Sequence, residues 1–255
     1  MIIHEMTWTE LNEHDWQDAV VVIPLGATEQ HGPHLPTDVD TRIIGELAQA
    51  VERQRREHIV LTPTIWLGHS PHHLSFGATL SISLRPYVEM VKAVCESYIG
   101  MGASKIWLLN GHGGNRTPLA VVLQDLKLAF PEVVVTASEY WSLARESIAS
   151  LRESGPGGMG HACELETSLY LYLNGDGVRK NLIRDDGFSP NSLHSSLDML
   201  QGESFSAVYN FCEISSSGVN GRPSLAAKEK GEQWYRMIVE NLLDFADRLI
   251  SLKRK

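Results

Sequence analysis

The sequence predicts an α/β fold in which helices cover a mostly parallel β-sheet. Residues 19–25 and 105–109 are short, nearly continuous apolar runs, and such runs are typical of strands buried on both faces. Segments with helical spacing of apolar residues separate them, and this alternation favours a layered α/β domain. The chain has 255 residues. That length allows one substantial core, so we expect a single domain spanning residues 1–255.

The first half of the chain opens with a polar segment whose Trp8, Leu11 and Trp16 we expect to cover one edge of the core. Apolar spacing then predicts a helix after the first strand, with Asp40 able to cap it. In order, the predicted elements are the strand Ala19–Leu25, the helix Thr41–Arg55, the strand His58–Pro63, the edge strand Thr79–Ser83 and the helix Arg85–Met101.

The second half repeats the pattern and ends in a long helix with one apolar face. Residues 174–206 are polar and rich in turn residues. No element is predicted there, and we expect this region to form part of the substrate pocket. The predicted elements are the strand Lys105–Leu109, the helix Pro118–Ala129, the strand Val133–Ala137, an apolar helix that ends at Leu173, and the helix Pro223–Leu252.

Composition argues against several classes of function. A formal net charge of −9 disfavours nucleic acid or an anionic membrane surface as the partner. The N-terminus lacks the features of a signal peptide and no apolar run approaches a membrane span, so we expect a cytoplasmic protein. Cys95, Cys163 and Cys212 form no CxxC pair and are interpreted as small buried hydrophobic residues. A thiol nucleophile at Cys163, close to His161, is the alternative.

Polar side chains gather directly after the first predicted strand. Glu29 and His31 are two residues apart, so in an extended segment they share one face about 6.5–7 Å apart. That separation suits two metal ions about 3.5–4 Å apart, and the two oxygens of Asp40 could bridge them. Mixed oxygen and nitrogen ligands favour Zn²⁺, Mn²⁺ or Fe²⁺ over Ca²⁺. The alternative is a polar loop that ends in a helix cap.

Two further polar clusters follow. His112 comes directly after the strand 105–109, between glycines that leave room for a metal and a substrate. Ligands bind at this end of the strands in open α/β sheets. A phosphate-binding loop is the alternative, although the lysine of a Walker A motif is absent. His161, Glu164 and Glu166 stand at a predicted helix start, where the dipole favours acidic residues in any case. We expect the metals to need only one of these glutamates, and Glu164 to face solvent or to support the ligands from outside.

Four spaced motifs stand along the chain: PLGATEQHGPHLP at 24–36 with Asp40, NGHGGN at 110–115, His161-Ala162 with Glu166-Thr167-Ser168, and GVNG at 218–221 with Pro223 and Glu229-Lys230-Gly231. They cover about residues 20–235 and, in this order, resemble the motifs of the creatininase (creatinine amidohydrolase) family. The resemblance implies a three-layer α/β/α sandwich, a homo-oligomer with a hexamer favoured, and a hydrolase that uses two divalent metal ions, Zn, Mn or Fe, on a small-molecule substrate.

Carried over by position, the resemblance assigns metal ligands. Glu29 and His31 would each hold one metal, Asp40 would bridge the two, and His112 would complete the first site.

This chain also departs from the family pattern. Creatininase itself has an aromatic residue and a metal-binding glutamate directly after the histidine that matches His112, where this chain has Gly113 and Gly114. We expect the missing carboxylate to come from Glu166, with Glu164 as the second choice. Creatininase also has a tryptophan where this chain has Gly157, which argues against creatinine as the substrate.

These observations predict a metal-dependent amidohydrolase that cleaves a C–N bond, other than a peptide bond, in a small amide, formamide or cyclic amide. A water bridging the cations would attack the carbonyl carbon, and His161 would protonate the leaving nitrogen or polarise the carbonyl. Ser70, His72 and His73 are weaker candidates for substrate contact. The alternatives are a ring-opening hydrolase of a cyclic ketone or lactone and, from another class, a catalytically inactive metal-binding family member.

Overall fold

A four-stranded parallel sheet forms the centre of the computed structural model, which describes residues 1–187, 198–200 and 208–253. The strand order is β2-β1-β3-β4, and all three pairings are parallel. The predicted mostly parallel sheet is therefore confirmed. The strands are β1 (Val20–Leu25), β2 (Ile59–Leu61), β3 (Lys105–Asn110) and β4 (Val134–Glu139).

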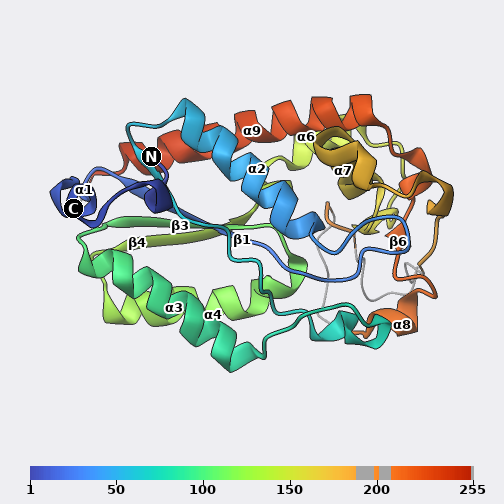
Figure 1. Ribbon diagram of the computed structural model, residues 1–255, viewed down its shortest axis with the longest axis horizontal. Coiled ribbons are helices and arrows are strands. Elements are labelled where there is room, and N and C mark those ends of the chain that lie inside the picture. Colours follow the sequence, from blue (N-terminus) through green and yellow to red (C-terminus); the bar gives the residue numbers. More distant parts are fainter. Residues whose placement is uncertain (188–197, 201–207, 254–255) are drawn as a thin grey trace.

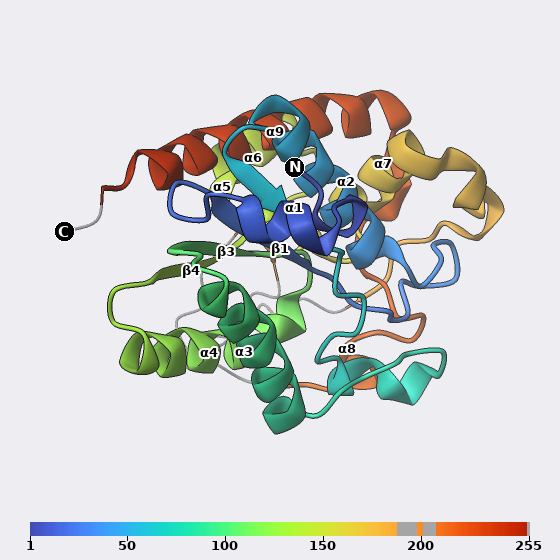
Figure 2. The same cartoon turned by 60° about the vertical axis from the view of Figure 1, so that its left-hand side comes forward.

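Helices cover both faces of this sheet (Figure 1, Figure 2). One face carries α2 (Val39–Gln54) and α9 (Lys228–Ser251), against which α7 (Glu164–Asn174) packs. The other face carries α3 (Leu84–Gly100) and α4 (Arg116–Ala129).

Alternate residues of each strand feed the two layers of the core. Val20 and Val22 join the hydrophobic cluster of α2, α7 and α9, whereas Val21 and Ile23 join that of α3 and α4. Because both faces of the sheet are covered, the central strand β1 is buried and apolar along its whole length and β3 is apolar between its two ends, as the sequence pattern indicated, whereas the edge strand β4 is half-buried and partly polar. The three-layer α/β/α architecture is confirmed.

Short elements complete the chain and escape prediction because they span too few residues to show a period. An antiparallel pair of strands, β5 and β6, lies outside the main sheet. These elements are α1 (Trp8–Glu13), α5 (Tyr140–Leu143), α6 (Arg145–Leu151), α8 (Phe211–Ile214), β5 (Met159–His161), β6 (Asn220–Gly221) and the 3₁₀ turns Ile3–Glu5, Pro71–Phe76, Gly113–Asn115, Gly175–Gly177, Lys180–Leu182 and Pro223–Leu225.

The prediction of an edge strand at Thr79–Ser83 is wrong. This segment makes only isolated bridges, in which Leu80 pairs with Thr28 and Ser81 with Gly68. Its alternating pattern is real, but its backbone partners are two loops beside the site rather than a neighbouring strand.

Several smaller expectations also change. Asp38, not Asp40, stands at the N-cap of α2, so the Asp40 side chain is free to face inward from the first turn. Trp8 is 74% exposed and covers nothing, whereas Trp16 is buried in the core. The C-terminal helix begins at Lys228 rather than Pro223, because a 3₁₀ turn precedes it.

Two findings bear on what surrounds the fold. No helix in the described part of the chain is long and apolar enough to cross a membrane. The expectation that residues 174–206 form part of the substrate pocket falls mainly on residues 188–197 and 201–207, which lie outside the described residues.

Candidate metal centre

The candidate site lies where β1 and β3 end. Leu25 stands opposite Asn110 in the sheet register, and the N–H of Gly111 donates to the carbonyl of Leu25 at 2.8 Å. The loops that follow the two strands are therefore neighbours. They bring together the five predicted metal ligands, all at most 4% exposed, which we call the central cluster: Glu29, His31, Asp40, His112 and Glu166.

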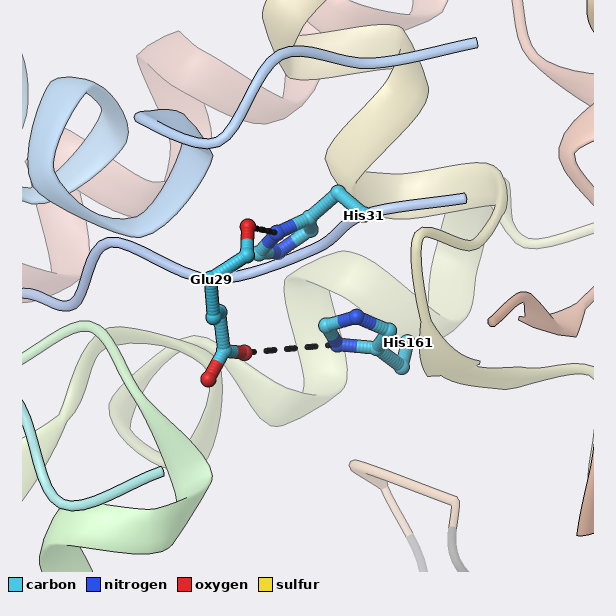
Figure 3. A group of neighbouring side chains, drawn as sticks. All are labelled: Glu29, His31 and His161. Atoms are coloured by element: carbon cyan, nitrogen blue, oxygen red, sulfur yellow. Dashed lines mark hydrogen bonds and ion pairs between the residues drawn. The ribbon is translucent and has the colours of Figure 1, made fainter. Parts of the chain in front are cut away.

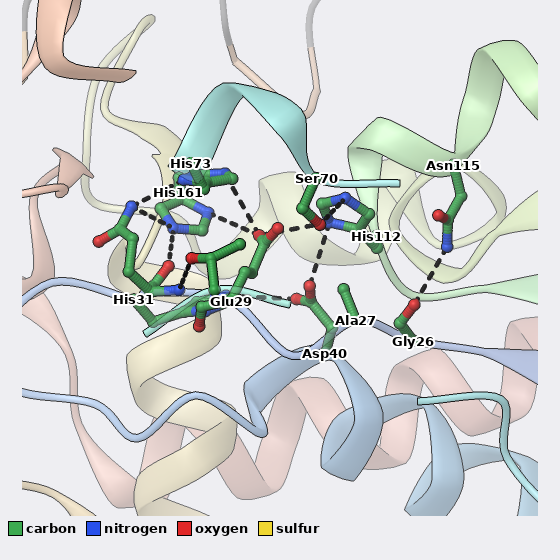
Figure 4. A network of polar contacts seen from close by, with 12 residues as sticks. Gly26, Ala27, Glu29, His31, Asp40, Ser70, His73, His112, Asn115 and His161 are labelled. Carbon is green, nitrogen blue, oxygen red and sulfur yellow. Dashed lines mark hydrogen bonds and ion pairs between the residues drawn. The ribbon is translucent and has the colours of Figure 1, made fainter. Parts of the chain in front are cut away.

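Asp40 occupies the middle of the central cluster. Its Oδ1 lies 3.2 Å from Nε2 of His31, and its Oδ2 lies 3.1 Å from Nδ1 of His112. On one side, Oε1 of Glu29 is 3.3 Å from the same His112 nitrogen; on the other, Oε1 of Glu166 is 3.8 Å from the same His31 nitrogen. The cluster therefore divides into two ligand groups that share one aspartate, seen in part in Figure 4.

The outer nitrogens of both histidines are already bonded to the protein. Nδ1 of His31 lies 3.2 Å from the main-chain oxygen of Glu29, and Nε2 of His112 lies 3.2 Å from that of His69. A carbonyl can only accept, so these nitrogens carry the protons, and in the neutral rings the inner nitrogens present lone pairs. Fixing the outer nitrogen in this way is the usual arrangement of metal-binding histidines.

Acceptors therefore face acceptors in the centre of the cluster. Three of its buried atoms, Oε2 of Glu29, Nε2 of His31 and Oδ2 of Asp40, have no hydrogen-bond partner among the residues that the structure describes. Buried polar atoms are rarely left unpaired. An arrangement of lone pairs around unfilled positions is what a cation requires.

The pKa values show the same demand for positive charge. Burial alone would lower the pKa of His31, but the carboxylates of Asp40 and Glu166 raise it well above its ordinary value. His112 is likewise opposed by burial, yet Glu29 and Asp40 raise its pKa to about 10. Burial would raise the pKa of Asp40, and the two imidazoles instead lower it. Without metal, protons on the histidines take the place of cations.

His161, the predicted catalytic residue, faces the cluster from β5. Its Nε2 lies 2.7 Å from the main-chain oxygen of Gln30, so Nδ1 points inward, 3.7 Å from Oε1 of Glu29 (Figure 3). Burial and the neighbouring His31 lower the pKa of His161 well below its usual value. An ordinary imidazole would be partly protonated near neutral pH. In this structure the ring is neutral, with a lone pair facing inward.

A strained backbone position supports this orientation. Ala162 adopts φ = 49°, in the left-handed region that non-glycine residues rarely occupy. It turns the chain between β5, which carries His161, and α7, which carries Glu166. Strain of this kind is concentrated at functional sites.

Ser70 and His73, the predicted substrate contacts, also lie at the cluster, and each touches a predicted ligand. Oγ of Ser70 is 3.0 Å from Nε2 of His112, and Nε2 of His73 is 3.3 Å from Oε1 of Glu29 (Figure 4). His72, in the same 3₁₀ turn, stacks nearly parallel to His112, with ring centroids 5.9 Å apart.

Three residues that the sequence analysis missed complete the surroundings. The side-chain nitrogen of Gln30 lies 2.8 Å from Nδ1 of His73 and 3.2 Å from Nε2 of His161. Asn115 ties together the loops after β1, β2 and β3, because its side chain bonds to main-chain atoms of Gly26 and His69 and to Asn110. Both stand inside the quoted motifs, which was the available signal. Phe211 packs on His73 with centroids 4.0 Å apart, and no sequence pattern singles it out.

Glu164 and Glu166 are distinguished by their partners. Oε2 of Glu166 accepts from the N–H of Cys163 at the start of α7, which leaves Oε1 to face His31. Glu164 is fully buried and paired with Lys230 at 2.6 Å, so the expectation that it faces solvent is wrong. Its position away from the cluster leaves Glu166 as the carboxylate beside His31.

The cysteines have no place in this chemistry. Cys163 is fully buried, and burial together with Glu166 raises its pKa, so its thiolate is disfavoured. Cys212 is exposed, contrary to its interpretation as a buried residue.

Gly114 explains why no carboxylate follows His112. A Cβ there would lie 2.2 Å from the main-chain oxygen of His69 and 2.5 Å from Nε2 of His112. Any side chain would displace the loop that holds the histidine. A ligand equivalent to the creatininase glutamate must therefore come from another element.

Comparison with known proteins agrees with this geometry. The family model for creatinine amidohydrolase matches residues 4–246. The chain is 30% identical to the mycofactocin precursor peptide peptidase of Mycobacterium tuberculosis, over 87% of this chain and 82% of the relative. It is 28% identical to the 3-dehydro-scyllo-inosose hydrolase of Thermotoga maritima, over 96% of this chain and 81% of the relative.

The fold has solved counterparts. A crystal structure of creatinine amidohydrolase superposes with a TM-score of 0.81 at 23% identity, covering 99% of this chain and 98% of the other. A putative creatinine amidohydrolase from Bacteroides fragilis gives a TM-score of 0.80 at 21% identity, covering 99% and 97%. With the family model matching nearly the whole sequence, the chain belongs to the creatininase family of hydrolases.

Proposed function

We propose that this chain binds two divalent cations in the central cluster and hydrolyses a C–N bond of a small amide, formamide or cyclic amide. The observation that carries the proposal is the meeting of unpaired, buried lone pairs from Glu29, His31 and Asp40 around the shared aspartate. Removing this many acceptor atoms from water without a cation would be costly.

Each ligand group would hold one ion. Glu29 and His112 would bind the first, His31 and Glu166 the second, and Asp40 would bridge both. Imidazole and carboxylate ligands suit Zn²⁺, Mn²⁺ or Fe²⁺, and related creatininase structures are described as Mn and Zn-Zn forms. When bound, such a pair lowers the pKa of a water and stabilises negative charge on a carbonyl oxygen.

The protein's own residues would manage the proton. Since Nε2–H of His161 is committed to the carbonyl of Gln30, Nδ1 is the atom that takes up a proton and returns it to the leaving nitrogen. The low pKa of the ring in this structure suits acceptance first and donation second.

Aromatic rings shield the site from bulk water. Phe211 lies against His73 and His161, with centroids 4.0 and 4.8 Å away. Electrostatic interactions are stronger in such a dry site. Phe211 is therefore the side chain we expect a substrate to meet first.

The space beside β5 favours a substrate other than creatinine. A cavity of about 440 Å³ lies there, lined by residues that include Gly157, Gly158, Gly187 and Arg222. A tryptophan in place of Gly157 would fill part of it. None of the residues that line this cavity belongs to the central cluster.

A second candidate function has support from one relative. The Thermotoga maritima protein is named as the hydrolase of an inosose, which is a cyclic ketone. The same site could open such a ring, because the attacked atom is again a carbonyl carbon. The peptidase relatives make short peptides a third substrate class to assay.

The test begins with metal content. Protein purified without chelators should contain close to two Zn, Mn or Fe ions per chain by plasma mass spectrometry. Assays of formamides, cyclic amides, cyclic ketones, lactones and short peptides would follow. Release of an amine or formate indicates an amidase, whereas a single hydrated acid indicates ring opening.

Negative results are also informative. Absence of bound metal after reconstitution would overturn the proposal, and bound metal without turnover on any class would favour an inactive family member. We also propose a homo-oligomer, with a hexamer favoured, which light scattering of the same sample would test.

A further inference from the structure

Gln30 lies between Glu29 and His31, and its side chain points to the outside of the cluster, where its hydrogen bonds fix its orientation. Oε1 accepts from the N–H of Gly32 at 2.9 Å, which identifies the oxygen. Nε2 therefore faces the main-chain oxygen of Gly218 at 3.0 Å, Nδ1 of His73 at 2.8 Å and Nε2 of His161 at 3.2 Å.

An amide nitrogen has two protons for these three neighbours, so the assignment is determined. The oxygen of Gly218 can only accept and takes one. Nε2 of His161 donates to the main-chain oxygen of Gln30 and cannot also accept. The second proton therefore goes to Nδ1 of His73.

This assignment gives His73 a definite tautomer. With Nδ1 accepting, its proton is on Nε2, 3.3 Å from Oε1 of Glu29. His73 is then a donor that orients a predicted metal ligand. Groups that orient ligands from behind typically contribute 10- to 100-fold to metal affinity.

The main-chain carbonyl of Gly218, which accepts from Gln30, is positioned by the segment that precedes it. Gly218 has φ = 81°, and a Cβ there would lie 1.9 Å from Oε1 of Gln30, so only glycine permits this approach. The segment before it, Ser215–Ser217, wraps one carboxylate oxygen, Oδ2 of Asp186. That oxygen accepts from all three serine hydroxyls and from the N–H groups of Ser216 and Ser217, at 2.6–3.2 Å.

We propose that Asp186 is a positioning residue which, through the Ser215–Gly218 segment and Gln30, holds His73 in the tautomer that donates to Glu29. Five donors on one oxygen exceed what a surface turn needs, and Oδ1 takes a sixth from the N–H of Gly187 at 2.7 Å. Its relevance to the reaction rests on the function proposed above, whereas the tautomer itself can be measured without metal.

The test is the tautomer of His73 in metal-free protein labelled with ¹⁵N-histidine, read from two-bond ¹H–¹⁵N correlations at one fixed pH. His73→Gln identifies the signals. The wild type should show an unprotonated Nδ1 and a protonated Nε2. Gln30→Met removes both amide donors, so the His73 nitrogen shifts should move towards a mixture of tautomers.

Asp186→Asn should move the same signals in the same direction, because an uncharged amide oxygen is a weaker acceptor than a carboxylate oxygen and the amide NH2 would meet the N–H of Gly187 or those of the serines. Asp185→Asn is the matched control: Asp185 is the neighbouring acid and accepts from the N–H and Oγ of Ser224, at 3.0 and 2.8 Å, away from Gly218. It should leave the His73 spectrum unchanged. If Asp186→Asn does not fold, Ser217→Ala removes one hydroxyl donor and serves in its place.

A double variant tests whether Gln30 and Asp186 act on His73 along the same path. Gln30→Met with Asp186→Asn should shift His73 no further than Gln30→Met alone, since both act on one path. In metal-reconstituted protein, Gln30→Met should weaken binding of the first ion roughly 10-fold or more. Wild-type His73 signals in both Asp186→Asn and Ser217→Ala would overturn the proposal. Altered signals in a protein that never binds metal would keep it and refute the proposed function instead.

Discussion

Glu164 and Glu166 lie two residues apart in the first turn of α7, and both are buried. Their surroundings differ completely. Glu164 accepts from the N–H groups of Glu153 and Ser154, at 3.1 and 2.8 Å, and from Lys230 at 2.6 Å. Glu166 directs one oxygen towards His31, and in the described part of the chain it forms no ion pair with a lysine or an arginine.

The comparison teaches how to separate structural from functional carboxylates. A buried acid that finds a full set of donors is stabilised within the fold, as the lowered pKa of Glu164 shows; burial would raise it, and Lys230 and Ser154 lower it. An acid among other acceptors requires something the chain does not supply. The central cluster is of the second kind.

The largest effect that would test this difference is expected at Asp40, the residue shared by both ligand groups. Asp40→Asn keeps the size of the side chain but weakens the bridge, so metal content should fall from two ions towards zero. Hydrolysis should fall about 10³-fold or more, because the charge stabilisation supplied by a metal is worth several kcal/mol. Plasma mass spectrometry and the best substrate from the screen measure both. Two retained ions with full activity would contradict the bridged site.

Replacing each of the two glutamates in turn by glutamine tests the comparison directly. Glu166→Gln should lose the second ion, with little change in the Tm of the metal-free protein. Glu164→Gln should keep both ions but remove the buried carboxylate from Lys230, whose other carboxylate partner, Glu153, is exposed; breaking a buried pair costs about 3 kcal/mol. That loss corresponds to a Tm lower by roughly 6–12 °C. Calorimetry gives the Tm of both variants, and metal analysis gives their ion content. If Glu164→Gln lost an ion and Glu166→Gln kept both, Glu164 would be the ligand.

The fold was predictable because its central strands are buried on both faces. β1 and β3 read as apolar runs for that reason, and helices at the expected spacing cover them. β5 and β6 span three and two residues, and their pairing depends on contacts between segments some 60 residues apart. No local pattern encodes such a pairing.

The candidate site was predictable only in part. Glu29, His31, Asp40 and His112 stand in dense polar motifs at strand ends, and the structure brings them together. The partners that separate Glu164 from Glu166 could not be foreseen, since Lys230 is 66 residues from Glu164 in the sequence. The same holds for Gln30 and Gly218, which are 188 residues apart.

Gly113 and Gly114 offer a more local test of the central cluster, with a smaller expected effect. Gly114→Ala places a Cβ against the main-chain oxygen of His69, which holds Nε2 of His112. Loss of that support should weaken the first metal roughly 10- to 100-fold. Gly113→Ala is the control, because a Cβ there meets nothing within 4 Å. Chelator competition measures both, and equal affinities would show that the loop yields without moving the histidine.

The smallest expected effect concerns pH in the metal-free protein. The pKa of His112 is raised to about 10 in the folded state, against an unfolded value of about 6.5. The stabilisation from its protonated form is therefore complete below pH 6.5 and is lost as the pH rises towards 10. Between pH 7 and 8.5 we expect a loss of about 2 kcal/mol, or roughly 4–8 °C in Tm.

Metal loading should abolish this pH dependence, because cations take the positions that the protons hold in the cluster. His31 and His112 both have raised pKa values, so reconstitution with Zn²⁺ at pH 7 should release about two protons, and apparent affinity should rise with pH. Titration calorimetry in buffers of different ionisation enthalpy counts these protons. The metal-free His112→Gln variant should show a clearly weaker pH dependence of Tm than the metal-free wild type, with the remainder coming from His31. If it keeps that dependence, the stabilising charge lies elsewhere, and the central cluster would resemble Glu164 in being paired within the fold.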